Sequence, residues 1–320
     1  MKILKLNALI LTVIILLSCM TGCTDLVSKF YPVSTTEELT YDFIPETAAD
    51  GEILFKDFDG NEISMPDAPQ RIVSVSSVAT EIICGLGASR YIIGLDDSSS
   101  RIEGAPIGAA VLPYYYMSFS DIVALEPDVV FYSSEYISSL TLDALKATDL
   151  KLVRIPASGN IATAEANIRF IAALLYRDEA GNKMIGEMRH EFDKIKTAAQ
   201  LVGVRKRIYI EYMSEFYACG GTTLLSEICD MARFDNVYED IDGYKTVNAS
   251  SLIEKNPEVI LLAGLASSSE SSIRNRKSIE KVSAIKENKI HVYNISNAMR
   301  PTQNIVNTAK EIAKLLGTTN

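Results

Sequence analysis

Short runs of β-branched and other apolar residues alternate with short amphipathic segments in the first half of this 320-residue chain. Continuous apolar runs predict buried strands, and apolar positions spaced by three and four predict helices. The expected strands lie at 71–76, 91–95, 129–132 and 152–155, and the expected helices lie at 80–86, 120–125 and 142–147. Because strands that alternate with helices form parallel sheets covered on both faces, this pattern predicts an α/β lobe.

Two longer helices interrupt the alternation. Residues 162–176 carry apolar positions on one face, and residues 179–199 continue that spacing over ~30 Å at about 1.5 Å per residue. The alternation then returns, with strands expected at 207–212, 259–262 and 290–293 and helices at 224–232 and 306–316. A hairpin with arms at 52–58 and 62–65 precedes the first lobe. We therefore predict two similar parallel-sheet α/β lobes joined by one long helix.

One segment recurs in both halves of the chain. Residues 120–130 and 250–260 each consist of a short amphipathic helix, a proline, an acid and a β-branched strand. Arg71 and Arg207 open the two halves in the same way. Any helix–proline–strand unit looks similar, so chance likeness is the alternative, but the shared order favours an internal repeat.

The N-terminus has the layout of an export signal. The first five residues carry two lysines, Lys2 and Lys5, residues 7–17 are almost wholly apolar, and small residues stand before Cys19 and Cys23. About eleven apolar residues are too few to span a bilayer, which takes ~20. The ending resembles a lipoprotein cleavage box, in which an acylated cysteine holds the protein at a membrane surface. Either cysteine fits this role, and an ordinary cleaved signal is the alternative.

These patterns divide the chain into five parts. A signal with its lipidation site is expected at 1–23, followed by a flexible tether rich in Ser, Thr, Glu and Pro at 24–51. The roughly 300 remaining residues are enough for two lobes with their own cores. We expect an N-terminal lobe at 52–160, connecting helices that include the interlobe helix at 161–203, and a C-terminal lobe at 204–320.

Composition disfavours several functional classes. The formal charge is −10 and no Lys/Arg cluster stands out, so nucleic acid is a poor partner. The sequence has two histidines, His190 and His291, no spacing typical of a zinc site and no Gly-x-Ser-x-Gly elbow, which argues against a hydrolase. Cys219 and Cys229 could pair in an oxidising compartment, or they could, like Cys84, be small buried hydrophobes.

The order of the elements resembles the substrate-binding proteins of ABC importers for iron complexes, haem and cobalamin. The likeness extends from about residue 55 to residue 316, and its marks are 69–74, 79–82, 86–88, 122–130, 218–222, 252–260 and 300–301. It implies two lobes that flank a cleft, a rigid linking helix that permits little closure, and no enzymatic activity. It also implies a monomer that is lipid-anchored to the outer face of the cytoplasmic membrane and works with ABC permease and ATPase subunits.

The carboxyl ends of the predicted strands supply the first candidate ligand-binding residues. Ligands of open parallel sheets sit beyond these ends. The polar or aromatic residues there are Ser76, Ser77, Tyr132 and Tyr212. Two facing lobes would align these ends along one cleft.

Tyrosines and one arginine complete the candidate site. The chain has 15 tyrosines and no tryptophan, and the resemblance implies cleft aromatics at or next to Tyr114, Tyr212 and Tyr244. An aromatic face offers a large contact area at low entropy cost, and a tyrosine can ligate haem iron. The resemblance also implies a cleft arginine at Arg300, whose planar fork suits an anionic iron chelate. Surface roles are the alternative for all of these residues and for the neighbouring candidates Tyr115, Tyr116, Tyr217, Glu135 and Glu215.

One departure from the family pattern concerns docking. Relatives carry a glutamate on each lobe that pairs with permease arginines, whereas the matching positions here hold Ser120 and Ser250. Asp121 is adjacent on the first lobe, but Ser251 offers no charge on the second. Docking through two ion pairs is therefore in question.

The main hypothesis is a membrane-anchored receptor that captures an iron(III) complex of the siderophore type and delivers it to a permease. No intrinsic cofactor or metal site is expected. Haem or corrinoid binding by the same fold is the first alternative, and a stand-alone sensor or scavenger without permease docking is the second.

Overall fold

The computed structural model describes residues 46–47, 53–113, 116–134, 137–264, 270–294 and 299–318. All of them belong to one compact unit formed by residues 35–320. The predicted signal, most of the predicted tether, and the candidate residues Cys19, Cys23, Tyr114, Tyr115 and Glu135 lie outside the described residues.

A small antiparallel sheet leads into the first lobe. Strand β1 (Glu46–Thr47) pairs with β2 (Ile53–Lys56), and β2 pairs with β3 (Glu62–Met65). The buried Asp57 carboxylate closes the turn between β2 and β3, because it accepts hydrogen bonds from the backbone N–H groups of Asp59 and Asn61 at 2.9 and 2.8 Å. The predicted hairpin is confirmed.

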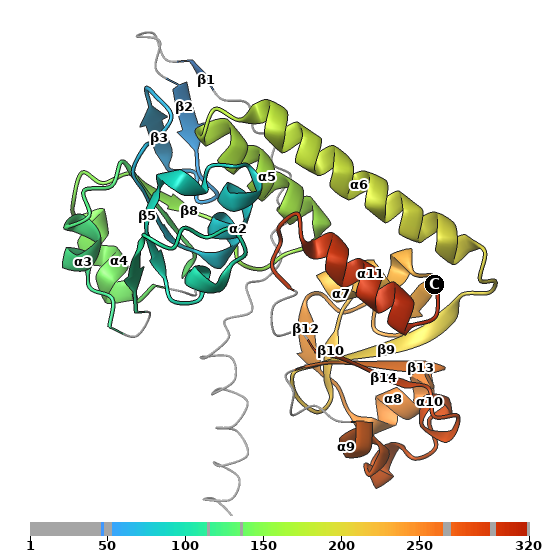
Figure 1. Ribbon diagram of the computed structural model, residues 1–320. Helices are drawn as coiled ribbons and strands as arrows, with labels where there is room; N and C mark the ends of the chain where they lie inside the picture. Colours follow the sequence, from blue (N-terminus) through green and yellow to red (C-terminus); the bar gives the residue numbers. More distant parts are fainter. Residues whose placement is uncertain are drawn as a thin grey trace, which may run out of the picture. The chain divides into compact units, whose positions relative to one another are not determined.

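Five parallel strands in the order β6-β5-β4-β7-β8 form the sheet of the N-terminal lobe (Figure 1). The strands are β4 (Ile72–Val75), β5 (Ile92–Asp96), β6 (Ala110–Leu112), β7 (Val129–Tyr132) and β8 (Leu152–Arg154). The connecting elements are α2 (Ser77–Gly85), η1 (Ser89–Tyr91), η2 (Ser99–Arg101), α3 (Phe119–Val123) and α4 (Ser139–Lys146).

Both faces of this sheet are covered, which explains the continuous apolar runs in its central strands. Ile72 of β4 and Phe131 of β7 belong to a large apolar cluster with residues of α2 and α5. Val73 and Val130, the residues directly next to Ile72 and Phe131 in their strands, belong to a separate cluster with residues of α3 and α4. Alternate side chains of a strand point to opposite faces, so both faces must be apolar here.

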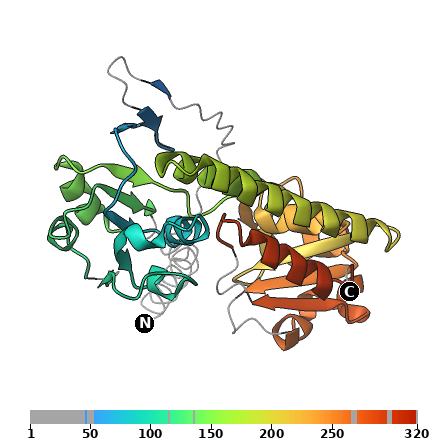
Figure 2. The same cartoon turned by 45° about the horizontal axis from the view of Figure 1, so that its top comes forward.

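Helices α5 (Ile161–Leu174) and α6 (Asp178–Gln200) pack against each other and lead from the first lobe to the second (Figures 1 and 2). Ile185, Met188 and Phe192 of α6 are buried, as their spacing predicts. Gly181 allows the close approach of the two helices, because a Cβ at this position would lie 2.5 Å from the Cβ of Ala172. A glycine inside a helix costs about 1 kcal/mol relative to alanine, and at Gly181 the close packing accounts for its presence.

The C-terminal lobe contains a mixed six-stranded sheet in the order β12-β10-β9-β13-β14, with β11 also paired to β9. The strands are β9 (Lys206–Tyr212), β10 (Tyr217–Cys219), β11 (Phe234–Asn236), β12 (Tyr244–Thr246), β13 (Val259–Gly264) and β14 (Ile290–Asn294). The helices are α7 (Leu224–Met231), α8 (Ala249–Lys255), α9 (Glu270–Arg274), η4 (Lys277–Ile279), α10 (Ser283–Lys286) and α11 (Ile305–Leu315). Strands β10 and β12 run antiparallel to their neighbours, and the apolar pattern did not predict them as strands.

The internal repeat is reproduced in atomic contacts. In the first lobe, the Asp128 carboxylate accepts a hydrogen bond from the backbone N–H of Arg71 at 2.8 Å, and the Arg71 guanidinium donates to the backbone at the end of α3. In the second lobe, Glu258 accepts from the backbone N–H of Arg207 at 3.0 Å, and Arg207 donates to the carbonyl of Lys255 at the end of α8. Both lobes therefore form the same hydrogen bonds at the start of a strand, which favours a true repeat over chance likeness.

The predicted fold class is confirmed, with the addition of the two antiparallel strands in the second sheet. One apolar cluster extends from Phe55 in the first lobe through α6 to Ala313 in α11. The lobes therefore share a core along the linking helix. The predicted domain limits stay predictions.

Candidate ligand-binding site

Three predicted ligand-binding tyrosines meet at one end of the C-terminal sheet. Tyr212 ends β9, Tyr217 begins β10 and Tyr244 begins β12. The antiparallel pairing of β10 with both neighbours brings these positions together. The ring centroids of Tyr212 and Tyr244 are 4.7 Å apart, and those of Tyr217 and Tyr244 are 5.9 Å apart with an interplanar angle of 19°. We call these three residues the tyrosine cluster.

Burial favours the neutral phenol at two members of this cluster. Burial, followed by the nearby Cys219, Tyr212 and Tyr217, raises the pKa of Tyr244 well above its ordinary value. Burial also raises the pKa of Tyr217. A half-buried group of neutral rings offers apolar faces together with hydroxyl groups that both donate and accept hydrogen bonds.

A tight loop links two members of the cluster. Residues 213–216 connect β9 to β10, and Met213 and Phe216 adopt positive φ angles of 63° and 59°. Each such conformation costs a non-glycine residue about 1–2 kcal/mol. The loop therefore needs compensating contacts, and the backbone N–H of Met213 makes one with the carbonyl of Ala263 at 2.8 Å.

The other main contact is a buried ion pair that sequence reasoning missed. The Glu211 carboxylate accepts hydrogen bonds from Arg276 Nη1 and Nη2 at 2.6 and 2.7 Å and from the backbone N–H of Phe216 at 2.9 Å. The two side chains are 7% and 9% exposed. The only available sequence signal was an acid at an inward position of a β-branched strand. Glu215, which was a candidate, is exposed and lies 3.4 Å from Arg276 Nε.

Arg300 is committed to an ion pair between the lobes. Its Nε and Nη2 donate to the Glu81 carboxylate of α2 at 3.2 and 3.0 Å, and Thr302 Oγ1 donates to the same group at 2.5 Å. Burial raises the pKa of Glu81, but the hydrogen bond and charge of Arg300 together with Thr302 outweigh it, and the pKa lies below its ordinary value. Glu81 was missed as a site residue, although it interrupts the apolar residues of a helix that packs in the core.

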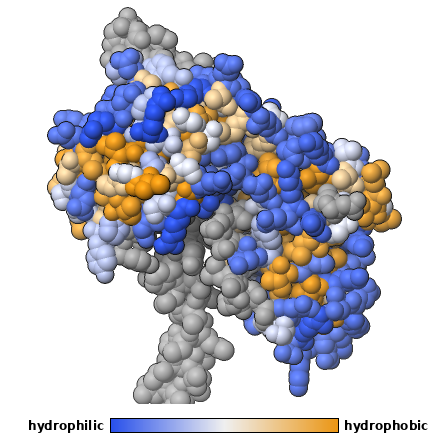
Figure 3. All heavy atoms as spheres, viewed as in Figure 1, coloured by the Kyte–Doolittle hydropathy of each residue, from blue (hydrophilic) through white to orange (hydrophobic). Residues whose placement is uncertain are grey.

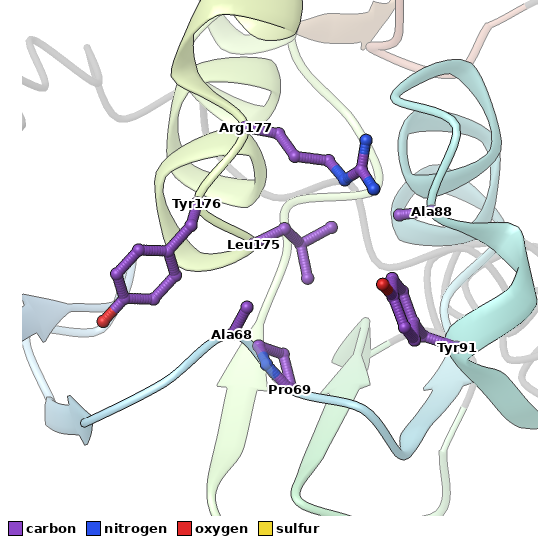
Figure 4. A pocket seen from close by; sticks show the side chains of 7 residues that line it. All are labelled: Ala68, Pro69, Ala88, Tyr91, Leu175, Tyr176 and Arg177. Atoms are coloured by element: carbon purple, nitrogen blue, oxygen red, sulfur yellow. The ribbon is translucent and has the colours of Figure 1, made fainter.

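A cavity of about 270 Å³ lies apart from the tyrosine cluster (Figure 4). It is lined by Ala68, Pro69, Ala88, Tyr91, Leu175, Tyr176 and Arg177. All of these residues come from the N-terminal lobe or from the junction of α5 with α6, and none is a predicted ligand residue.

Residues 72–295 match the model of a family described as periplasmic binding protein. The chain belongs to the periplasmic binding protein family. This membership confirms the predicted resemblance and places the chain among extracytoplasmic solute-binding proteins of transporters rather than among enzymes. Along the described residues, no helix is both long and apolar enough to cross a membrane.

Individual relatives are distant but cover most of the chain. An uncharacterised ABC transporter substrate-binding lipoprotein of Bacillus subtilis is 17% identical over 268 residues, which cover 82% of this chain and 84% of that protein. A vitamin B12-binding protein of Vibrio campbellii is 22% identical over 258 residues, which cover 79% and 92%. A possible iron-binding (periplasmic solute-binding) protein from Staphylococcus epidermidis superposes with a TM-score of 0.71 at 21% identity and covers 78% of this chain and 98% of that one. The last likeness shows the fold alone.

Within this periplasmic binding protein, three predicted ligand residues of the N-terminal lobe lie in its interior. Ser76 caps α2 by accepting from the backbone N–H of Ala79 at 3.2 Å, and its hydroxyl lies 2.7 Å from that of Ser133. Ser77 is buried beside it. Tyr132 is 3% exposed, and burial, followed by Asp59 and Asp57, raises its pKa to about 12. As predicted, these residues lie at or next to the carboxyl ends of strands. Their side chains, however, pack in the interior of the lobe.

The remaining candidates of the first lobe lie around α3. Tyr116 is exposed just before this helix, and Ser120 is exposed on it. The Asp121 carboxylate forms a capping box with Ser118, whose backbone N–H donates to it at 2.9 Å and lowers the pKa of the acid. Ser250 is exposed on α8, the equivalent helix of the second lobe.

The histidines and cysteines offer no competing chemistry in the described part of the chain. Burial, followed by Lys289, lowers the pKa of His291, and no group of three or more Cys, His, Asp or Glu side chains there could hold a metal ion. Cys219 and Cys229 are buried free thiols. The structure therefore matches the alternative in which they are small buried hydrophobes without a disulfide.

Proposed function

We propose that this protein is a membrane-anchored receptor that captures an iron(III) complex of the siderophore type and delivers it to an ABC permease. The observation that carries the proposal is the tyrosine cluster, in which the Tyr244 ring lies within 6 Å of the rings of both Tyr212 and Tyr217 at an antiparallel sheet edge. Aromatic faces bind the apolar body of a chelate, and neutral hydroxyls bind its oxygens without a charged partner. The same fold occurs in a possible iron-binding protein.

Haem and corrinoids are the alternative ligands. A tyrosine can ligate haem iron, and the likeness to a vitamin B12-binding protein supports a corrinoid. Ferric chelates, haem and corrinoids all absorb visible light. The absorption spectrum of protein purified from its own cell would therefore separate them directly.

Titration tests the site itself. Because the chain has no tryptophan, its fluorescence comes from tyrosine, and a bound coloured ligand should quench it. We expect one of three probes, a ferric trihydroxamate, haemin or cyanocobalamin, to quench, and Tyr244→Ala to weaken that binding at least tenfold. Tyr293→Phe, on β14 outside the cluster, is the matched control and should bind like the parent protein. Absence of quenching by all three probes, or equal affinity of the Tyr244 variant, would contradict the proposal.

Delivery to a permease needs a contact surface on each lobe. The equivalent helices α3 and α8 expose an apolar side chain at the same position of the repeat, Val123 at 37% and Ile253 at 36%. The N-terminal lobe exposes further apolar side chains, namely Phe119 on α3, Tyr116 just before it, Val111 on β6 and Leu140 on α4. Figure 3 shows apolar atoms gathered on this lobe. Exposed apolar patches mark contact surfaces. We propose that they take the place of the ion pairs that Ser120 and Ser250 cannot form.

Stimulation of the permease ATPase by ligand-loaded protein tests this contact. Val123→Asp and Ile253→Asp should each reduce stimulation without changing ligand affinity. Leu201→Asp, in an exposed turn after α6, is the control. If the parent protein binds its ligand yet gives no stimulation with the neighbouring permease, the stand-alone sensor or scavenger becomes the better proposal.

The anchor is proposed on Cys19 or Cys23. Mass spectrometry of protein extracted from membranes should find one of these cysteines acylated at the mature N-terminus. Release of the Cys19→Ser or the Cys23→Ser variant into the soluble fraction would identify which one. Size-exclusion chromatography of the soluble form should give a monomer.

A further inference from the structure

The wall of the 270 Å³ cavity has an apolar half and a polar half (Figure 4). Its apolar half consists of Pro69, Ala88 and Leu175, all buried, with Ala68 at the edge. Its polar half consists of the Tyr91 hydroxyl and the Arg177 guanidinium, which extend toward the same space. A binding site for a small amphipathic molecule has this composition, with an apolar lining and a few convergent polar groups.

Two arginines converge on the Tyr91 hydroxyl. Arg90 Nη2 donates to this oxygen at 2.5 Å, and the Arg90 Cζ lies 4.6 Å from the centre of the Tyr91 ring. The Arg90 hydrogen bond, with the charges of Arg90 and Arg177, lowers the pKa of Tyr91. Arg177 Nη1 donates to the carbonyl of Leu86 at 3.1 Å, which fixes the guanidinium at the cavity wall.

In the part of the chain that the structure describes, these two cations have no carboxylate partner. Among the described residues, neither Arg90 nor Arg177 forms an ion pair, whereas Arg276 and Arg300 pair with Glu211 and Glu81. The contrast is informative because the chain carries ten more acids than bases. Two fixed guanidinium groups beside one opening produce a positive field that favours an anion.

A strained turn shapes this wall. Tyr176 adopts a φ of 55°, a conformation that costs a non-glycine residue about 1–2 kcal/mol. The turn places Leu175 and Arg177 on the cavity and directs the Tyr176 hydroxyl away from it, to the carbonyl of Met65 at 2.8 Å (Figure 4). Burial, followed by the charge of Asp67, raises the pKa of Tyr176. Asp67 therefore acts on a hydroxyl that points away from the cavity.

We propose that this cavity binds a small organic oxyanion, a carboxylate or phosphate attached to an apolar group, with the anion on Arg177 and Tyr91 and the apolar group against Leu175. The cavity volume of about 270 Å³ lies at the lower end of typical ligand pockets, which are about 300–1,000 Å³, and so suits a small ligand. None of the lining residues belongs to the tyrosine cluster, so the proposal is independent of the ligand assigned to that cluster.

Isothermal titration calorimetry of the full protein with four small probes tests the chemistry. Benzoate and phenyl phosphate present the two oxyanions on the same ring, benzamide removes the charge, and benzylamine reverses it. We expect at least one of the two anions to bind, benzamide to bind at least tenfold more weakly, and benzylamine not to bind. Failure of both anions at millimolar concentration, or equal affinity for benzamide, would overturn the proposal.

Two variants locate the site. Arg177→Gln should weaken binding of the anion at least tenfold, and Ala68→Phe should abolish it by filling the cavity while leaving Arg177 in place. Arg101→Gln, at an exposed position on η2, is the matched control and should bind like the parent protein. If Arg177→Gln fails to fold because the contact with Leu86 is lost, Ala68→Phe decides alone. Unchanged anion affinity in Ala68→Phe refutes the assignment, and unchanged binding of the coloured ligand in that variant shows that the two sites are separate.

Discussion

Replacing Glu81 with Gln should remove the main polar link between the two lobes. The Glu81 side chain is 9% exposed and that of Arg300 is 22% exposed. Breaking a buried ion pair by removing one partner costs about 3–5 kcal/mol. Because water can reach Arg300 and Gln retains one acceptor oxygen, we expect a smaller loss of about 2–3 kcal/mol in the free energy of unfolding. At about 2–4 °C per kcal/mol, the midpoint of thermal unfolding should fall by about 4–12 °C.

The same experiment decides between two roles for Arg300. If Arg300 serves the link, Arg300→Gln should destabilise the protein like Glu81→Gln, and a double-mutant cycle should give a coupling energy of about 1–3 kcal/mol. If Arg300 contacts ligand as first predicted, Arg300→Gln should weaken ligand binding while Glu81→Gln, which frees the guanidinium, should leave it equal or stronger. Thermal unfolding by circular dichroism and calorimetric titration supply the two readings.

The pH dependence provides an independent check. The folded-state pKa of Glu81 lies below its ordinary value of 4.5, mainly through Arg300. A depressed pKa contributes stability that is fully present above the unfolded-state pKa and is lost as the pH falls through the folded-state value. The stability difference between the parent and Glu81→Gln should therefore be constant from pH 7 to about 5 and shrink below. A difference that does not shrink on acidification, or strictly additive effects of the two substitutions, would refute the reasoning.

Three further outcomes follow from the contacts described above. Glu211→Gln should cost about 3–5 kcal/mol of unfolding free energy, because it breaks the buried pair with Arg276. It should also change the near-ultraviolet circular dichroism of the tyrosines. An unchanged spectrum would mean that the loop at 213–216 does not depend on this pair. Asp128→Asn and Glu258→Gln alter equivalent positions of the repeat and should destabilise the protein by similar amounts, measured by urea unfolding; a large effect at only one position would argue against equivalent roles. Cys219 and Cys229 should be unreactive toward a thiol reagent in the native protein and both reactive in denaturant, whereas two missing thiols in denaturant would reveal a disulfide.

Much of the fold was predictable because local signals and the global architecture agree. The runs at 72–75 and 129–132 are buried on both faces, so their sequence is apolar except for Ser74 and identifies them as central strands of a parallel sheet. The strands β10 and β12 escaped prediction because each is only three residues long. Pairing of β10 with β9 and of β12 with β10, rather than local propensity, maintains them.

The site was predictable only in part. Tyr212 and Tyr244 were chosen from a strand end and from resemblance, Tyr217 was a neighbouring candidate, and the structure brings the three together. Ser76 and Tyr132 satisfied the same rule of strand ends but face the interior of their lobe. A position along the chain fixes which end of a strand a residue occupies, but not whether its side chain reaches the surface.

The sequence itself determined the alternation of strands and helices, the two-lobe plan and the repeated helix–proline–strand segment. Hydrophobic period and turn chemistry are properties of neighbouring residues and can therefore be read along the chain. The partners of Glu81, Glu211 and Arg177 were decided only by tertiary structure. An ion pair such as Glu81–Arg300 joins residues more than 200 positions apart, and a cavity is the space left when distant elements pack. Neither leaves a periodic trace in the chain, since both depend on which surfaces finally meet.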